Sequence, residues 1–258
     1  MIDYHIHSLY SDGKNTYKEL LKTAYERKLS EIGFSDHLCL YYPDWSVKES
    51  QLSKLSDDVI SLKNNSSIPV KVKFGFEVDY IDGKEDDIKK MLDKFPLDYV
   101  IGSVHYINRW NFDTIADDYD SVDIDKFYYE YFLLIQKAAK SKLFDIIGHA
   151  DLAKKFAFYP SFNLDAIYEE TAKVFAASDV VVEINTSGRD KPCKEFYPSA
   201  GFLKQLFKHG VPVTLGSDSH HISHIARYFN DAIQLLKEIG YTQIVSFIQR
   251  KRNYVPIV

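Results

Sequence analysis

The sequence has few of the features that mark secreted or membrane proteins. Only two cysteines occur among 258 residues, Cys39 and Cys193, and they form no CxxC pair. Such an uncrosslinked pair is typical of a reducing cytosol. No apolar run approaches the roughly 18 residues that a membrane-spanning helix needs, and the start, MIDYHIHSLYSDG, lacks the basic and apolar segments of a signal peptide. We therefore expect a cytoplasmic protein with no membrane partner.

Clusters of basic residues are also absent from the sequence. The chain has 32 Lys and Arg against 37 Asp and Glu, a formal net charge of −5, and the basic residues are spread along it. A nucleic-acid-binding surface usually shows a basic stripe, so we expect no nucleic-acid partner. A small anionic substrate, which one or two local cations can hold, fits this composition. The length and the lack of a linker predict one domain spanning residues 1–258.

Short apolar runs alternate with helical patterns along the chain. The runs are rich in β-branched and aromatic residues and too short for helices; they span 1–7, 31–37, 70–80, 98–107, 145–151, 180–186 and 212–220. Helix starts are expected at Thr16, at Asp123 or Asp125, at Asn163 and at Ser199, because these residue types cap helices. Glu19 would complete a capping box with Thr16. A further helix is expected over 224–240.

Seven strand-then-helix units in succession predict a parallel sheet, since parallel strands need long crossover connections. Closed on itself, this sheet forms an α/β barrel with about seven strands, related to the eight-stranded type. An open, doubly wound sheet is the alternative. The two longest irregular stretches, 38–49 and 108–122, follow the carboxyl ends of strands, where barrels place their active-site loops.

Ligand-type residues stand at the end of every predicted strand. The motifs are HIH at 5–7 with SDG at 11–13, SDH at 35–37, GFE at 75–77, GSVH at 102–105, GH at 148–149, EIN at 183–185 and SDSH at 217–220. Seven of the nine histidines fall in or beside these motifs. A lone strand histidine is usually a core or surface residue. Five or more buried imidazoles at one barrel mouth, however, would leave costly unpaired polar groups unless they bind metal.

The spacing of these residues supports a metal site. Because side chains alternate along a strand, His5 and His7 point to the same side, and Asp218 and His220 repeat this arrangement on the last strand. Imidazole nitrogen together with carboxylate oxygen suits Zn²⁺, Mn²⁺ or Fe, whereas Mg²⁺ and Ca²⁺ prefer oxygen ligands alone. The sequence therefore predicts a cluster of divalent Zn, Mn or Fe ions at the mouth of the barrel.

The set HIH, SDG, SDH, GFEVD, GSVH, GHAD, EIN and GSDSH resembles the polymerase and histidinol phosphatase (PHP) superfamily, in particular its histidinol-phosphate phosphatase branch. The motifs run in order from Asp3 to His220. The resemblance implies a distorted (β/α)7 TIM-like barrel with two to three metal ions. By motif position, the first ion would be held by His5, His7, Glu77 and Asp218, the second by Glu77, His105 and His149, and the third by Asp12, His37 and His220. Some members have His in place of Asp12, and Asn185 would lie near the site without being an assured ligand.

The activity implied is that of a metal-dependent phosphomonoesterase, a histidinol-phosphatase of histidine biosynthesis that hydrolyses L-histidinol phosphate to L-histidinol and phosphate. We expect attack by a hydroxide that bridges two ions, with Glu77, Asp218 and His220 as the catalytic residues. Arg189, in a Ser-Gly-Arg loop after a ligand-bearing strand, is the first candidate for binding phosphate, because guanidinium contacts phosphate bidentately. Lys154 or Lys155 is expected to supply a second cation.

Other functions are compatible with part of this motif set. A two-metal amidohydrolase also opens with HxH, but it usually bridges its metals with a modified lysine on the fourth strand, where this chain has His105. A PHP phosphoesterase acting on a nucleotide, a sugar phosphate or phosphotyrosine is the main alternative. A non-enzymatic metal-binding module would be expected to lack ligands, and all nine positions are occupied by ligand types.

Overall fold

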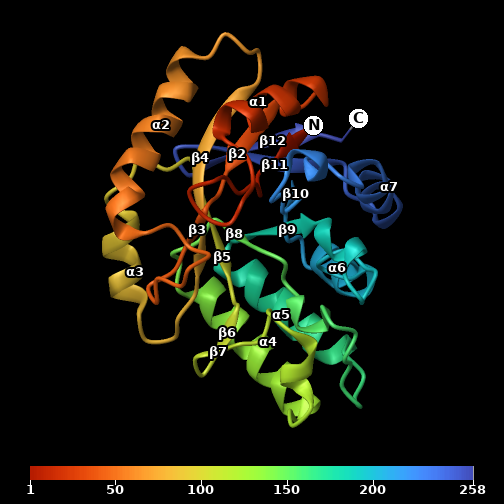
Figure 1. The fold of residues 1–258 in the computed structure, drawn as a ribbon. Helices are drawn as coiled ribbons and strands as arrows, with labels where there is room; N and C mark the ends of the chain where they lie inside the picture. The colour runs from red at the N-terminus through yellow and green to blue at the C-terminus, as the bar shows by residue number, and fades with distance from the viewer. Residues whose placement is uncertain (258) are drawn as a thin grey trace.

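Seven parallel strands form the centre of the computed structural model, which describes residues 1–257 (Figure 1). They pair in the order β1 (Ile2–Asp3), β2 (Glu31–Phe34), β4 (Lys71–Asp79), β5 (Tyr99–Ser103), β8 (Ile146–Ile147), β9 (Val181–Asn185) and β10 (Val213–Gly216). The first and last strands also meet, because the Tyr4 amide donates to the Leu215 carbonyl at 3.1 Å and Ile6 bridges Ser219 in parallel. The predicted seven-stranded barrel is thus confirmed, and the open sheet is not observed.

Several paired segments are shorter than the predicted strands. Pairing of β8 ends at Ile147, two residues before His149, and β10 ends at Gly216, two residues before Asp218. His149 and Asp218 have positive φ angles of 22° and 50°, so neither continues the extended backbone of its strand. The side chains of these ligands are therefore presented just beyond the carboxyl ends of the strands. A short additional strand, β3 (His37–Leu38), pairs His37 with Glu77 of β4.

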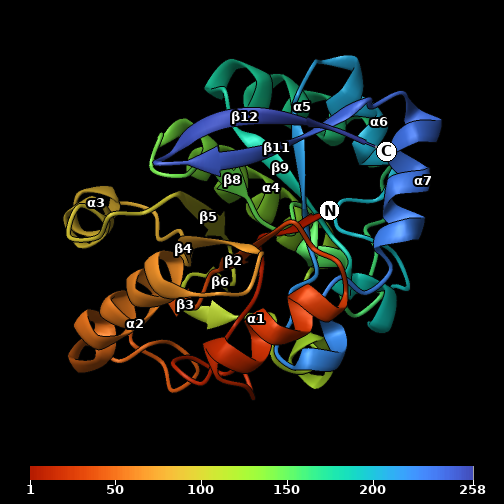
Figure 2. The same ribbon diagram turned by 90° about the horizontal axis from the view of Figure 1, so that it is seen from above.

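Seven α-helices surround the strands (Figures 1 and 2). They are α1 (Tyr17–Glu26), α2 (Leu52–Asn65), α3 (Glu85–Leu92), α4 (Ile124–Lys140), α5 (Asp165–Ser178), α6 (Ala200–Lys208) and α7 (Phe229–Ile239). The Thr16–Glu19 capping box is present, and Asp123 rather than Asp125 caps α4. Ser199 caps α6 as predicted. Across residues 1–257, no helix is long and apolar enough to cross a membrane.

The last helix begins later than the sequence predicts. Residues Ile222–His224 form one short 3₁₀ turn, and Tyr228 precedes α7 with a φ of 56°. The prediction of a helix from His224 was wrong because the Arg227 side chain, which bonds the carbonyls of Ser217 and Asp218, ties this segment to the barrel mouth. The helix ends as predicted at Gly240, whose φ of 120° suits glycine.

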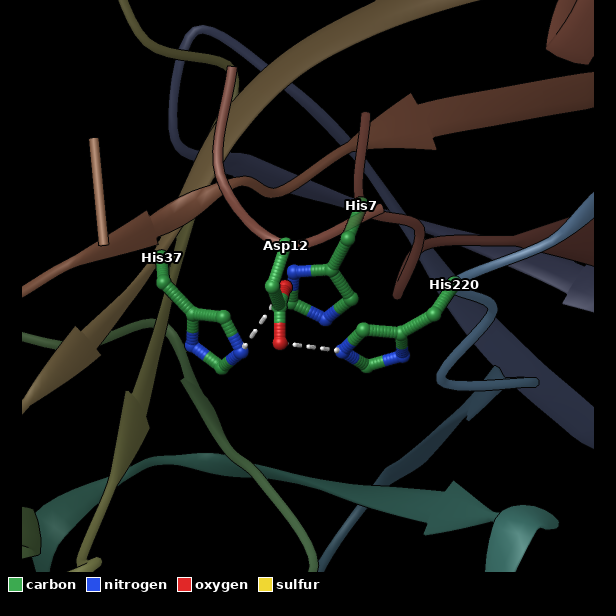
Figure 3. A group of neighbouring side chains, drawn as sticks. All are labelled: His7, Asp12, His37 and His220. Atoms are coloured by element: carbon green, nitrogen blue, oxygen red, sulfur yellow. Dashed lines mark ion pairs between the residues drawn. The ribbon is translucent and has the colours of Figure 1, made fainter. Parts of the chain in front are cut away.

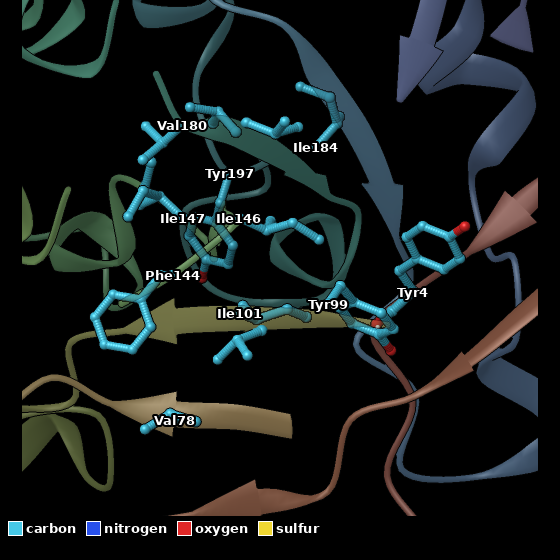
Figure 4. Close-up of a cluster of buried hydrophobic side chains, with 14 of the residues drawn as sticks. Tyr4, Val78, Tyr99, Ile101, Phe144, Ile146, Ile147, Val180, Ile184 and Tyr197 are labelled. Atoms are coloured by element: carbon cyan, nitrogen blue, oxygen red, sulfur yellow. Dashed lines mark hydrogen bonds between the residues drawn. The ribbon is translucent and has the colours of Figure 1, made fainter. Parts of the chain in front are cut away.

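The core lies between the strands and the helices and continues through the barrel interior. Figure 4 shows part of it, where Tyr99, Ile101, Ile146 and Ile184 are buried together with other strand residues. Because these strands are covered on both faces, they consist of nearly continuous apolar runs rather than alternating ones.

A C-terminal hairpin closes the amino-terminal end of the barrel. Strands β11 (Gln243–Ile248) and β12 (Lys251–Pro256) pair antiparallel, and Figure 2 shows them lying across the ends of the barrel strands. Phe247 is fully buried near the rings of Tyr4 and Tyr99, and its amide donates to the Tyr4 hydroxyl at 3.1 Å. This hairpin was not among the elements predicted from the sequence.

Candidate metal centre

All nine predicted ligands come together at the carboxyl end of the barrel. Three overlapping groups have potential ligand atoms within 4.8 Å of one another: His5, His7 and Glu77; Glu77, His105 and His149; and His7, Asp12, His37 and His220. Asp218 joins them, with Oδ1 3.5 Å from His7 Nε2 and 3.9 Å from His5 Nε2. The strand ends account for this, because the carboxyl ends of all parallel strands meet at one mouth.

Glu77 lies at the centre of the cluster. Its Oε2 is 3.0 Å from His5 Nε2 and 2.9 Å from His37 Nδ1, while its Oε1 is 2.8 Å from His149 Nε2. The Ser103 hydroxyl donates to Oε1 at 2.6 Å and helps to hold the carboxylate. The two oxygens thus face different histidines, which is the arrangement that a bridging carboxylate requires.

Asp12, His37 and His220 form the more exposed rim of the cluster, and Figure 3 draws them together with the buried His7. Asp12 lies between His220 and His37, with Oδ2 3.2 Å from His220 Nε2 and Oδ1 3.7 Å from His37 Nε2. The side chains of Asp12 and His220 are 33% and 34% exposed, whereas those of His7 and Glu77 are at most 1% exposed. The rim is therefore the part of the cluster that solvent reaches most directly.

The hydrogen bonding of the cluster supports metal binding. His5 Nε2, His7 Nε2, Asp12 Oδ1, His37 Nδ1 and Glu77 Oε2 are buried and have no hydrogen-bond partner among the described residues, although they face one another at short distances. Each unpaired buried polar group costs about 1–3 kcal/mol. Divalent ions relieve this cost by coordinating the facing atoms, and the mixed nitrogen and oxygen donors suit zinc and its neighbours.

Three side chains of the cluster, His7, Glu77 and Asp218, are held in the protonation states of metal ligands. Burial and the neighbouring His220 and His37 rings lower the pKa of His7 to about 3, so this imidazole is neutral. Burial alone would raise the pKa of Glu77, but the charges of His5 and His37 outweigh it and hold the pKa well below its usual value. The same balance, with His5 and His7 as partners, keeps the pKa of Asp218 low. Neutral imidazole and ionised carboxylate are the forms that bind metal. Burial lowers the pKa of His5, but the charges of Glu183 and Glu77 outweigh it and raise the pKa well above its usual value, so an ion that binds His5 displaces a proton.

Residues outside the predicted ligand set orient the ligands. Asp79 Oδ1 lies 2.9 Å from His105 Nδ1; burial lowers the pKa of His105, but the Asp79 charge raises it to about 10. Asp36 accepts hydrogen bonds from Ser8, Ser11 and Tyr17 and so holds the segment that leads to Asp12. Asp79 stands two residues after Glu77 on one strand, so side-chain alternation was a signal that could have identified it.

A pocket of about 380 Å³ opens above the cluster. Its outer wall includes Trp45 from the 38–49 loop and Asn111, Asp113 and Thr114 from the 108–122 loop, so both predicted loops border the site. Lys155, Lys191 and Arg227 supply the positive charge of the lining. An anionic group in this pocket would therefore lie among both the ligands and these cations.

The three predicted substrate-binding residues are placed differently. Lys155 lines the pocket and pairs with Asp113. The Lys154 side chain is 2% exposed and is held by Asp151 at 2.9 Å and Glu195 at 2.7 Å, outside the pocket lining. Arg189 is 42% exposed, lies 3.4 Å from Asp231 and is also outside the lining. The geometry thus brings only Lys155 of the three to the pocket.

Comparison with known proteins identifies the family. Residues 3–187 match the PHP domain, which is more than half of the chain. This chain belongs to the PHP family. The resemblance that the motifs indicated is therefore confirmed.

Relatives of this PHP protein cover nearly the whole chain. A probable histidinol-phosphatase of Deinococcus radiodurans is 33% identical, with 97% of this chain and 98% of the relative aligned. The histidinol-phosphatase of Lactococcus lactis is 25% identical over 95% of this chain and 94% of its own. The crystal structure of the Lactococcus lactis histidinol phosphate phosphatase, complexed with zinc, L-histidinol and phosphate, superposes with a TM-score of 0.82 at 24% identity, covering 98% of each chain. The fold of the two proteins is shared.

Proposed function

We propose that this protein is a metal-dependent histidinol-phosphatase, which hydrolyses L-histidinol phosphate to L-histidinol and phosphate in histidine biosynthesis. One observation carries the proposal: nine residues with nitrogen and oxygen ligand atoms converge at a pocket that Lys155, Lys191 and Arg227 also line. The full-length similarity to histidinol-phosphatases from two bacteria supports the substrate.

The residues fit two to three divalent ions, with zinc favoured by the Lactococcus lactis relative and Mn or Fe as alternatives. We assign His5, His7, Glu77 and Asp218 to one ion, Glu77, His105 and His149 to a second, and Asp12, His37 and His220 to a third. When bound, such ions lower the pKa of coordinated water and offset the charge of phosphoryl oxygens.

The chain's own side chains would orient the substrate. Lys155 lines the pocket and can donate to a phosphoryl oxygen, and Arg227, held by the Ser217 carbonyl and by Asp190, borders the same space. Asp218 and His220, 3.5 Å apart at the inner edge of the pocket, are the candidates for transferring a proton to the leaving alkoxide. Phosphate binding by Arg189 and Lys154 stays a prediction. Arg189 would have to leave Asp231, and Lys154 would have to leave Asp151 and Glu195, to reach phosphate.

A phosphatase screen tests the proposal. Purified protein with Zn or Mn should be assayed on histidinol phosphate, nucleotides, sugar phosphates and phosphotyrosine, with elemental analysis of the same sample. We expect the highest kcat/KM for histidinol phosphate and more than one metal equivalent per chain. A higher kcat/KM on another ester would reassign the substrate within the PHP family, and full activity in metal-free protein would overturn the proposal.

A further inference from the structure

Glu183 of β9 is a buried carboxylate that contacts two groups of the metal centre at once. Its Oε1 lies 2.6 Å from His5 Nδ1, on the opposite side of the ring from the ligand atom Nε2. Its Oε2 accepts the backbone amide of His149 at 3.0 Å and the Asn185 side-chain amide at 3.1 Å. Glu183 is only 1% exposed, and within residues 1–257 its sole ion-pair partner is His5.

The surroundings of Glu183 restrict its carboxylate to this position. A Cβ atom added to Gly216 of the neighbouring strand would come within 1.8 Å of Oε1, so only glycine leaves the space that the carboxylate occupies. The backbone amide that Oε2 accepts belongs to His149, whose φ of 22° is sparsely populated for a residue with a side chain. The carboxylate therefore orients the His5 ring and, by accepting the His149 amide, stabilises the strained backbone conformation of His149.

The two histidines of the rim, His37 and His220, contact no carboxylate outside the ligand set within residues 1–257. His220 Nδ1 contacts only the backbone carbonyl of Asp218 at 3.3 Å and the Asp218 carboxylate at 3.5 Å. His37 Nδ1 lies 2.9 Å from Glu77, which is itself a candidate ligand. The Asp12 side chain is partly exposed. Carboxylates that hold the far side of a ligand histidine fix its ring and raise its basicity, and their loss typically lowers metal affinity 10–100-fold. In this chain such carboxylates contact two of the inner histidines, Glu183 at His5 and Asp79 at His105.

We infer that Glu183 is a positioning residue that links the two inner ion sites, so that their ions are retained together while the ion of the Asp12–His37–His220 rim exchanges first. The inference rests on the proposed metal centre and adds an order of ion release to it. Its physical basis is that one immobile carboxylate determines both the tilt of the His5 ring and the backbone position of His149.

The test is chelator titration of the loaded protein, with metal equivalents per chain measured after dialysis at each chelator concentration. Wild-type protein should lose one equivalent at a concentration roughly 10–100-fold below that which removes the others. Asp12→Asn should lack only that first equivalent. Glu183→Gln, which keeps the side-chain volume but removes the charge, should release the inner ions at a chelator concentration 10–100-fold lower than wild type.

Glu31→Gln is the matched control, because Glu31 is also a buried strand carboxylate. It accepts a hydrogen bond from the Tyr4 hydroxyl and contacts none of the candidate metal ligands. The variant should release metal as wild type does. Thermal unfolding of each metal-free variant separates a folding defect from a metal defect: the inference requires that Glu183→Gln weaken metal retention beyond Glu31→Gln at comparable metal-free stability. Release of all ions in one step from wild type, or identical release by the two Gln variants, would overturn it. A wild type without metal or phosphatase activity would instead reject the proposed function.

Discussion

Both ends of the barrel contain buried carboxylates, but the two ends satisfy them differently. At the amino-terminal end, Asp98 accepts from Lys63 Nζ at 2.6 Å and from the backbone amides of Phe74 and Gln249 at 3.0 and 3.2 Å. Asp145, which precedes the next strand, accepts from Arg250 Nε at 2.8 Å and from a backbone amide at 2.9 Å. These carboxylates are compensated by cations and amides that the fold itself supplies.

At the carboxyl end, the ligand atoms that face one another have no cation or amide partner of this kind among residues 1–257. Glu77 Oε2 and Asp12 Oδ1 are buried without hydrogen bonds among residues 1–257 and are surrounded by imidazoles. A satisfied carboxylate joins strands to the C-terminal hairpin, whereas an unsatisfied one costs stability until an ion binds. Buried charge therefore stabilises one end of this barrel and prepares the other for metal. Substitutions at the two ends should separate these effects.

The largest effect is expected for Glu77→Gln. Removing the central charge should lower kcat by about 10³ or more, as loss of a major electrostatic element does, and reduce the metal equivalents per chain. Steady-state kinetics and elemental analysis measure both quantities. Wild-type turnover with full metal content would show that Glu77 only packs in its strand and would remove the contrast between the two ends.

At the opposite end, Asp98→Asn should change stability and leave the metal unaffected. The substitution removes the charge opposite the half-exposed Lys63 and weakens the acceptors of two backbone amides, so we expect a loss of about 2–3 kcal/mol in the free energy of unfolding. Urea denaturation measures the loss, and metal content should equal that of wild type. Loss of metal without loss of stability would contradict the assigned division between the ends.

The pocket cations give a smaller effect, confined to substrate. Lys155→Ala should lower kcat/KM on histidinol phosphate, with a loss of about 2 kcal/mol in transition-state stabilisation, because Lys155 lines the pocket. The metal content should not change. Arg189→Ala should lower kcat/KM less, since Arg189 is partly exposed and faces Asp231. A larger loss for Arg189 than for Lys155 would indicate that the Arg189 loop moves over the bound substrate.

The smallest effect is expected at a helix terminus remote from both sets of carboxylates. Thr16 caps α1 by accepting the Glu19 amide, so Thr16→Ala should reduce the free energy of unfolding by about 1 kcal/mol. Thr16→Ser keeps the hydroxyl and is the control, with little loss expected. Kinetics and metal content should stay at wild-type values; a drop in either would mean that α1 transmits strain to the Asp12 segment.

The sequence alone was sufficient for the repeating unit and for grouping the candidate ligands. Strands, helix caps and strand-end motifs are local patterns, and parallel topology brings every strand's carboxyl end to one mouth. Thus His5, Glu77, His105 and Asp218 could be grouped without knowing a single distance between them.

Only the tertiary structure showed which side chains contact residues far away in the chain and what role those contacts give them. Lys154 and Lys155 are adjacent and chemically identical, yet one is buried between Asp151 and Glu195 while the other borders the pocket. The C-terminal hairpin is defined by its packing across the barrel end, with Phe247 against Tyr4, more than 200 positions away in the chain. Glu183 and Asp79 orient histidines on other segments in the same way. A local pattern specifies which side of a strand a residue faces, but the partner it meets depends on how the whole barrel closes.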